Sequence, residues 1–336
     1  MKKGALAVDI IIPTYNGLPW LEKTVRSVLD QTYKNFTLYI IDDGSTDKTA
    51  AYVKALKDKR VRYLHKANGG QSTARNVGIK ASTSPLLAFL DSDDIWYPTK
   101  LEKQVAIMEK KPKVGMVYGH YYLIDEADEI ITYLQIWKRG RIFDDLLNGN
   151  IIAGSASMVL IRREVFDTLG LFKEDFLIGE DWEMWLRIAN SYDIDFVPEI
   201  IAGLRHRHDG MQKNYKKMAD GLVYAYGYIV HEFRMKGWRK RRFANATLYT
   251  ATELYMRAGF RTKAKITLLK LFAQSPSAFF ANGGWKIHYS TSFFMKAIFS
   301  TKIVRYATWQ VRRTERYAGR SIKAVLGHST EPGAKQ

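Results

Sequence analysis

Three carboxylates within four positions form the densest cluster of chemically active side chains in this sequence. Asp91, Asp93 and Asp94 come directly after an apolar run at positions 86–90. Like charges this close repel one another unless a cation lies among them, so we expect a divalent metal ion here. Oxygen ligands favour Mg²⁺ or Mn²⁺ over zinc. The alternative interpretation is a solvated cluster that caps the turn at positions 96–98.

A second pair of carboxylates could move a proton. Glu180 and Asp181 precede apolar side chains that recur at helical spacing, namely Trp182, Trp185, Leu186 and Ala189. Asp181 therefore lies in the first turn of a predicted helix, where a carboxylate often serves as an N-terminal cap and is stabilised as the anion. A general base must also be anionic, so capping and proton abstraction are compatible roles for this residue.

The elements that position these side chains alternate along the first two-thirds of the chain. Strands are predicted at 8–12, 36–41, 61–65, 86–90, 114–118 and 156–161. Helices are predicted at 18–31, from a cap at Thr46 or Asp47 to about 57, and at 74–81. Polar residues follow three of the strands, at 14–16, 42–43 and 91–94. This alternation predicts an α/β fold with a mainly parallel sheet, which binds ligands at the carboxyl ends of its strands.

The charge is concentrated in the last third of the chain. Of the 52 basic and 34 acidic residues, 26 and 28 fall in residues 1–204, a net charge of −2. The remaining 26 basic and 6 acidic residues give residues 205–336 a net charge of +20. Helices are predicted there at 215–236, 239–260, 261–273 and 297–320. A near-neutral domain joined to a basic helical region indicates an anionic partner, either nucleic acid or a phospholipid surface.

The composition excludes several classes of protein. A hydrophobic fraction of 46% excludes a disordered chain, and the absence of Cys excludes disulfide frameworks and thiolate zinc sites. The chain has no run of about 18 apolar residues, so we expect no membrane-spanning helix. Its first residues lack the apolar run of a secretory signal, which predicts a protein on the cytosolic side.

Five segments occur in an order that resembles a known family. They are VDIIIPTYN at 8–16, IIDDGSTD at 40–47, NGGQ at 68–71, ARNVG at 74–78 and FLDSDD at 89–94. The series resembles the family 2 inverting glycosyltransferases, which have the GT-A fold, and it covers residues 8–212, or 205 of the 336 residues. The resemblance implies a GT-A catalytic domain over 1–212. From charge and composition we expect a basic helical region over 213–326 and a disordered tail over 327–336.

The resemblance implies a site for the nucleotide of a nucleotide-sugar donor. The first loop, with Pro13 and Tyr15, and the second carboxylate of the next loop, Asp43, would hold the base. A ring that stacks and an acceptor for a base N–H are the groups that such a pocket needs. Arg75 would lie near the base or the phosphates, and its alternative is an ordinary surface arginine.

The Asp-x-Asp element of the family corresponds to Asp91, Ser92 and Asp93. The resemblance implies that Asp91 reaches the ribose or the metal shell and that Asp93 binds the Mn²⁺ or Mg²⁺ that bridges the diphosphate. Asp94 is equally suited to holding the loop. The metal and nearby cations would neutralise the negative charge that develops on the leaving diphosphate.

The remaining site residues lie later in the chain. The family has a Glu-Asp motif whose aspartate is the general base, which implies that role for Asp181, while Glu180 would orient the acceptor or support the loop. Members of the family often carry an Arg and a His near the diphosphate; this chain has two of each at positions 205–208, and of the two histidines we choose His208 over His206. The usual Arg-x-His spacing is missing here, and histidines such as these are often structural.

The sequence therefore predicts a metal-dependent inverting glycosyltransferase that builds cell-surface polysaccharide or glycolipid, with UDP as the favoured donor nucleotide. In the basic region after position 232, Lys and Arg residues alternate with aromatic residues. This pattern suits an anionic membrane surface, so we expect a peripheral protein on the inner face of the plasma membrane. The alternatives are transfer onto a polyprenyl phosphate, a domain that binds without catalysis, and a nucleic-acid-binding protein. The last is disfavoured because the basic region matches no known nucleic-acid module.

Overall fold

The chain forms two compact units, Met1–Met235 and Lys236–Gln336. The computed structural model describes residues 5–18, 20–152, 155–208, 210 and 213–275. The expected boundary between residues 212 and 213 lies one helix before this division, because α8 (Tyr215–Glu232) belongs to the first unit. The predicted helix at 297–320 and the predicted disordered tail at 327–336 lie outside the described residues.

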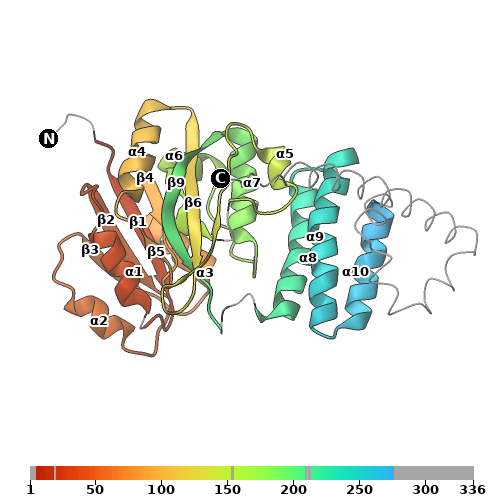
Figure 1. Ribbon diagram of the computed structural model, residues 1–336, viewed down its shortest axis with the longest axis horizontal. Coiled ribbons are helices and arrows are strands. Elements are labelled where there is room, and N and C mark those ends of the chain that lie inside the picture. Colours follow the sequence, from red (N-terminus) through yellow and green to blue (C-terminus); the bar gives the residue numbers. More distant parts are fainter. Residues whose placement is uncertain (1–4, 19, 153–154, 209, 211–212, 276–336) are drawn as a thin grey trace, which may run out of the picture. The chain divides into compact units, whose positions relative to one another are not determined.

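The first unit is built on one mixed sheet of nine strands among the described residues (Figure 1). The strand order is β3-β2-β1-β4-β8-β6-β9-β5, and β7 pairs with β6. The strands are β1 (Val8–Thr14), β2 (Phe36–Asp42), β3 (Val61–His65), β4 (Leu86–Phe89), β5 (Ile95–Trp96), β6 (Val114–Ile124), β7 (Ile130–Leu134), β8 (Leu160–Arg162) and β9 (Asp193–Arg205). Strands β3, β2, β1 and β4 run parallel, whereas β8 is antiparallel to both of its neighbours. The predicted α/β class is confirmed.

The helices follow the predicted alternation with shifted ends. They are α1 (Trp20–Leu29), α2 (Thr49–Ala55), α3 (Gln71–Ala81), α4 (Lys100–Lys110), α5 (Phe143–Leu146), α6 (Arg163–Leu169), α7 (Glu180–Ser191) and α8, with α9 (Gly237–Arg257) and α10 (Arg261–Gln274) in the second unit. The N-cap of α2 is Lys48 rather than Thr46 or Asp47, although Asp47 accepts a hydrogen bond from the Thr49 backbone N–H at 2.9 Å. The predicted strand at 156–161 is instead a 3₁₀ turn (Ala156–Met158) followed by β8.

The core explains why five of the seven residues of β1 are apolar. All seven of its residues are buried, because β2 and β4 pair with both of its edges and α3 packs on its face. Gly78 permits the close approach of α3, since a Cβ atom there would lie 2.6 Å from the Ile11 side chain. This contact brings the first turns of α3 close to the carboxyl edge of the sheet.

Strand β9 was not predicted, because Pro198 lies in its middle. The pairing of β6 with β9 shifts register at this point, where Gly119 pairs with Val197 and His120 pairs with Ile200. A proline is tolerated at such an irregularity because its missing N–H is not needed there. The strand therefore continues to Arg205 and ends among the loops at the carboxyl edge.

The second unit is described only through α9 and α10, which pack against each other. Both helices match the sequence prediction to within three residues at each end. No helix in the described part of the chain is long and apolar enough to span a bilayer.

Candidate active site

The loops that carry the predicted chemistry meet at one edge of the sheet. Thr14 at the end of β1 lies opposite Asp42 at the end of β2, and the Asp43 backbone N–H donates to the Thr14 carbonyl at 2.8 Å. The chain leaves β4 at the same level, where the Leu90 N–H donates to the Ile11 carbonyl. Because β1, β2 and β4 are parallel neighbours, their carboxyl ends gather the three polar clusters, as the sequence predicts.

The first two loops differ in how accessible their side chains are. The Tyr15 side chain is 53% exposed, so its ring is open to a stacking partner. Pro13 is buried inside β1 and lies two residues before that ring. Asp43 is buried and accepts hydrogen bonds from the Gly69 and Gly70 backbone N–H groups at 3.0 and 2.7 Å. Its carboxylate therefore holds the loop that leads into α3.

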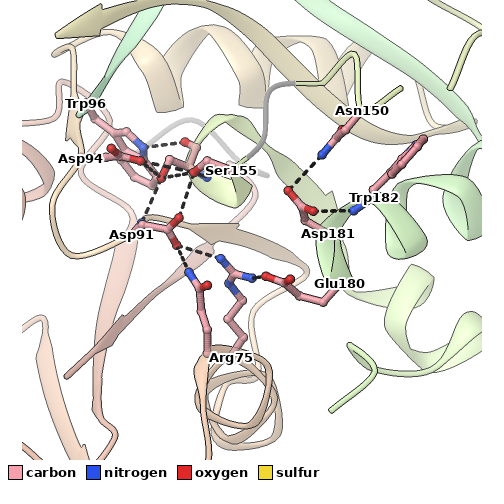
Figure 2. Close-up of polar contacts among 11 residues, drawn as sticks. Arg75, Asp91, Asp94, Trp96, Asn150, Ser155, Glu180, Asp181 and Trp182 are labelled. Atoms are coloured by element: carbon pink, nitrogen blue, oxygen red, sulfur yellow. Dashed lines mark hydrogen bonds and ion pairs between the residues drawn. The ribbon is translucent and has the colours of Figure 1, made fainter. Parts of the chain in front are cut away.

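Arg75 contacts Glu180 across 105 positions of the sequence and also contacts Asp91, so it joins two distant parts of the site. Its buried guanidinium lies 2.8 Å from a carboxylate oxygen of Asp91 and 2.8 Å from one of Glu180 (Figure 2). The interpretation of Arg75 as an ordinary surface residue is wrong. The arginine is positioned by the middle of α3, one turn before the glycine that lets this helix approach the sheet.

Asp94 holds the third loop in place. It accepts hydrogen bonds from the Ser157 hydroxyl at 2.6 Å and from the Arg205 backbone N–H at 2.8 Å. Burial, together with the nearby carboxylates of Asp93 and Asp91, raises the pKa of Asp94. These contacts favour a structural role for Asp94, and they exclude the interpretation of the three aspartates as a solvated surface cluster.

Asp91 and Asp93 have different partners in this loop. Besides Arg75, Asp91 accepts hydrogen bonds from the Gln71 side-chain amide at 2.7 Å and from the Ser155 hydroxyl at 3.0 Å (Figure 2). Asp93 lies 3.2 Å from Arg207, and its side chain keeps 26% of its surface exposed. Burial and the charge of Asp91 raise the pKa of Asp93.

These two carboxylates fit a hard divalent cation. The mutual repulsion that raises the pKa of Asp93 is relieved when a cation lies between it and Asp91, and both side chains are partly open to solvent. Within the described residues no group of three or more His, Cys, Asp or Glu side chains converges on one point. Such a pair suits Mg²⁺ or Mn²⁺, which complete their coordination with water and phosphate oxygens. Ser92, between them, is half-buried, and its carbonyl accepts from the Thr24 hydroxyl at 3.0 Å.

Asp181 lies across the site from the three aspartates, at the second position of α7. Its side chain is nearly buried, and its two oxygens accept from the Trp182 backbone N–H at 2.6 Å and from the Asn150 side-chain amide at 3.1 Å (Figure 2). The N-cap of α7 is Gly179, in the left-handed region at φ +84°, so the interpretation of Asp181 as the helix cap is wrong. Burial and the Glu180 charge raise the pKa of Asp181 to about 7. Desolvation therefore outweighs the helix N-terminus, which alone would stabilise the anion.

The apolar face predicted for this helix is confirmed. The side chains of Trp182, Trp185, Leu186 and Ala189 are buried. Trp182 also donates its ring N–H to the Leu146 carbonyl at 2.9 Å, which ties the end of α5 to the start of α7.

The histidine segment contributes arginines to the site. His208 is exposed and lies beside Glu126, with its ring nitrogen 3.1 Å from that carboxylate. Arg207 instead contacts Asp93, and Arg205 donates from its Nε atom to the Asp93 carbonyl at 2.8 Å. The prediction chose between His206 and His208. The side chains of this segment that contact Asp93 are instead the arginines on either side of His206, namely Arg205 and Arg207.

The predicted site residues did not include six members of this network, namely Gln71, Asn150, Ser155, Ser157, Arg205 and Arg207, although the resemblance had pointed to an Arg and a His of the 205–208 segment. The two arginines could have been found from the end of β9, because a strand that ends at the carboxyl edge delivers its last residues to the site. Nothing in the sequence around Asn150 or the two serines distinguishes them from ordinary loop residues.

Comparison with known sequences identifies relatives of this chain. The profile of the family described as "Glycosyl transferase family 2" matches residues 9–170. An uncharacterized glycosyltransferase of Rickettsia bellii is 33% identical over 234 residues, which are 67% of this chain and 32% of that protein. The matched chain thus spans about a third of the length of that relative.

Two Escherichia coli enzymes match over most of their own length. Both are named UDP-Glc:alpha-D-GlcNAc-diphosphoundecaprenol beta-1,3-glucosyltransferase. WfgD is 33% identical, covering 56% of this chain and 72% of that enzyme. WfaP is 32% identical, covering 65% of this chain and 80% of that enzyme.

Solved structures with the same fold are glycosyltransferases. TarS of S. aureus, determined with UDP-GlcNAc, has a TM-score of 0.52 and 16% identity over 78% of this chain and 90% of that one. The mannosyltransferase PcManGT of Pyrobaculum calidifontis, determined with GDP-Man and Mn²⁺, has a TM-score of 0.55 and 19% identity over 88% of this chain and 85% of that one. These neighbours confirm the predicted GT-A fold.

Proposed function

Since the chain belongs to glycosyltransferase family 2 and has the GT-A fold, we propose that it is a metal-dependent inverting enzyme. It moves a sugar from a nucleotide diphosphate, with UDP favoured, to a hydroxyl group of a saccharide or lipid-linked saccharide. The observation that carries this proposal is the buried Arg75, which links the carboxylate cluster at Asp91 to the segment that holds Asp181. A donor site and a proton acceptor are thereby held in one network.

The donor would lie across the carboxyl edge of the sheet. Tyr15 offers an exposed ring to the base, and the loop held by Asp43 forms the neighbouring wall. Asp93 and Asp91 would hold Mn²⁺ or Mg²⁺, which, when bound, neutralises charge on the leaving diphosphate. Arg207, beside Asp93, supplies a protein cation at the same place.

Asp181 would act as the general base. It takes the proton of the acceptor hydroxyl, whose oxygen attacks the anomeric carbon on the face opposite the diphosphate. The bond from that carbon to the phosphate oxygen breaks, and its electron pair leaves with the diphosphate, so the configuration inverts. A pKa of about 7 suits this role, because the group is ionised in part of the molecules at neutral pH and binds the proton strongly enough to remove it.

The acceptor would be a sugar linked to a lipid diphosphate. This class is proposed because the two Escherichia coli relatives are named for such an acceptor. Transfer onto a bare polyprenyl phosphate is the alternative within the same enzyme class. A phosphate acceptor needs little help from a base, so the position of Asp181 favours a hydroxyl acceptor.

A membrane surface is the proposed partner, and β7 supports it. All five residues of this edge strand are exposed, and four of them are apolar, namely Ile130, Ile131, Tyr133 and Leu134. Lys138, Arg139 and Arg141 follow, each paired with an aspartate and each more than half exposed. Apolar and aromatic side chains next to cations suit the interface of an anionic bilayer, where a lipid-linked acceptor resides.

This partner can be tested by vesicle flotation. The variant Ile131→Ser/Tyr133→Ser should float with anionic phosphatidylglycerol vesicles at least severalfold less than wild type. Leu177→Ser, which removes an equally exposed apolar side chain elsewhere, should float normally. Equal flotation of the two variants would exclude β7 as the lipid contact.

The enzymatic function is tested by calorimetric titration of the full chain with UDP, GDP and dTDP, each with Mn²⁺ and with chelator. Metal-dependent binding of one nucleotide is expected and would name the donor. Transfer is then measured from the matching nucleotide sugar to a synthetic GlcNAc-diphosphate lipid, with the product anomer determined by NMR. Binding of single-stranded DNA alone, lost at high salt and indifferent to metal, would instead support a nucleic-acid-binding protein.

A further inference from the structure

The turn that follows α5 delivers one side chain to the candidate base. The end of α5, just before this turn, is tied to α7 by the hydrogen bond from the Trp182 ring N–H to the Leu146 carbonyl. Gly149, at φ +146°, takes a backbone conformation that other residues rarely adopt. The chain then places Asn150 so that its Nδ2 atom lies 3.1 Å from Oδ2 of Asp181 (Figure 2).

The other end of the same amide group is unsatisfied. The Oδ1 atom of Asn150 is buried and has no hydrogen-bond partner among the described residues. An unpaired buried acceptor costs about 1–3 kcal/mol, so the amide orientation must be maintained by what its Nδ2 atom gains. That gain is a charge-assisted hydrogen bond to the Asp181 carboxylate. With the amide reversed, two oxygens would face each other and repel.

We propose that Asn150 is a positioning residue that serves both protonation states of the base, an inference that rests on the proposed function. While Asp181 is anionic, the Nδ2 atom of Asn150 donates to Oδ2 of the carboxylate. When the acceptor O–H bond breaks, its proton forms a new O–H bond on Asp181. A half-turn of the amide then presents the Oδ1 atom, which accepts a hydrogen bond from the new O–H group.

This arrangement keeps the second carboxylate oxygen oriented throughout the reaction. The first oxygen is held by the Trp182 backbone N–H, which is fixed by α7. The second oxygen, Oδ2, accepts a hydrogen bond from Asn150 and from no other described residue. Terminal amide torsions are soft and nearly two-fold, so the half-turn meets little resistance from the bond itself.

The charged groups that act on Asp181 are Glu180 on the same helix, Arg75 on α3 and Asp91 after β4. Glu180 and Asp91 raise the pKa of Asp181, and Arg75 lowers it. Asn150 is uncharged, but its hydrogen bond to the Asp181 carboxylate favours the anion. This bond therefore lowers the pKa of Asp181, whereas burial raises it. Hydrogen bonds to an anion are about twice as strong as those to a neutral acid, so removing the amide should raise the pKa of Asp181 by about 1 unit.

The test is an NMR titration of the Asp181 side-chain carbonyl in the ¹³C-labelled full chain, assigned by its loss in Asp181→Asn. Asn150→Ala should raise the pKa of Asp181 by about 1 unit. The isosteric Asn150→Asp should raise it further, because two adjacent carboxylates then share one proton. Asn148→Ala, in the same turn but exposed, is the matched control and should leave the pKa unchanged.

An unchanged pKa of Asp181 in folded Asn150→Ala would overturn the proposal, and so would an unchanged pKa in Asn150→Asp if the Ala variant does not fold. The titration needs no substrate, so its outcome does not depend on whether transfer is found. Where transfer is measured, Asn150→Ala should lower kcat about tenfold and leave the KM for the donor unchanged. A purely structural role would leave the pKa of Asp181 unchanged in Asn150→Ala.

Discussion

The replacement of Arg75 by Met tests the central feature of the site. Met keeps most of the apolar stem and removes the guanidinium, which is 1% exposed and makes ion pairs of 2.8 Å with both Asp91 and Glu180. The change therefore leaves two carboxylates facing each other without their shared cation. It also removes the positive charge that lowers the pKa of Asp181.

The size of the effect follows from the burial of the three groups. Removing one member of a fully buried ion pair costs about 3–5 kcal/mol, because it leaves an uncompensated charge. The carboxylates of Asp91 and Glu180 keep 19% and 13% of their surface, so water screens part of this penalty. We expect a loss of about 3 kcal/mol in the free energy of unfolding, which corresponds to a drop in Tm of about 6–12 °C for a unit of this size.

The assay is thermal and urea unfolding of the full chain at pH 7. Arg60→Met is the matched control, since its ion pair with Asp58 is part-exposed and should contribute at most about 1 kcal/mol. The double variant Arg75→Met/Glu180→Gln should recover part of the loss, because one of the stranded charges is gone. A loss below about 1 kcal/mol for Arg75→Met alone would refute the reasoning that this arginine neutralises the network.

Three further predictions concern the reaction. Asp181→Asn should lower kcat by about 10²–10⁴-fold while donor affinity measured by calorimetry stays the same, because an amide keeps the shape but takes no proton; full activity would remove Asp181 from the base role. Since the base must be ionised and its pKa is raised to about 7, the rate of the wild type should rise nearly tenfold between pH 6 and pH 8 and level off above, and a rate that falls with rising pH would contradict this sign. Asp93→Ala should weaken Mn²⁺-dependent nucleotide binding by about tenfold or more, and the same affinity with and without Mn²⁺ in wild type and variant would exclude Asp93 as a ligand.

Much of the catalytic unit could be predicted from the sequence. Strands β1 to β4 and the helices between them were predicted from the hydrophobic pattern. Strands β1 and β4 are buried throughout, as expected inside a parallel sheet, whereas β3 at the edge is only partly buried. The sequence also correctly predicted that the polar residues that follow β1, β2 and β4 lie together at the carboxyl edge of the sheet. Strand β9 was not predicted. A proline inside a strand is tolerated only where the pairing of that strand is irregular, and here the irregularity depends on the partner strand β6.

The sequence by itself determined the family, the order of the motifs and the types of side chain available for chemistry. Only the tertiary structure decided which of them act together. Arg75 contacts Glu180 across 105 positions of the sequence, and Asp93 contacts Arg207 across 114. At such separations the local sequence pattern does not indicate which residues come together. The protonation of Asp181 depends likewise on burial and on neighbours brought from three other segments. Desolvation is a property of the packed fold, so a first-turn carboxylate that local rules describe as a stable anion becomes a group that titrates near neutral pH.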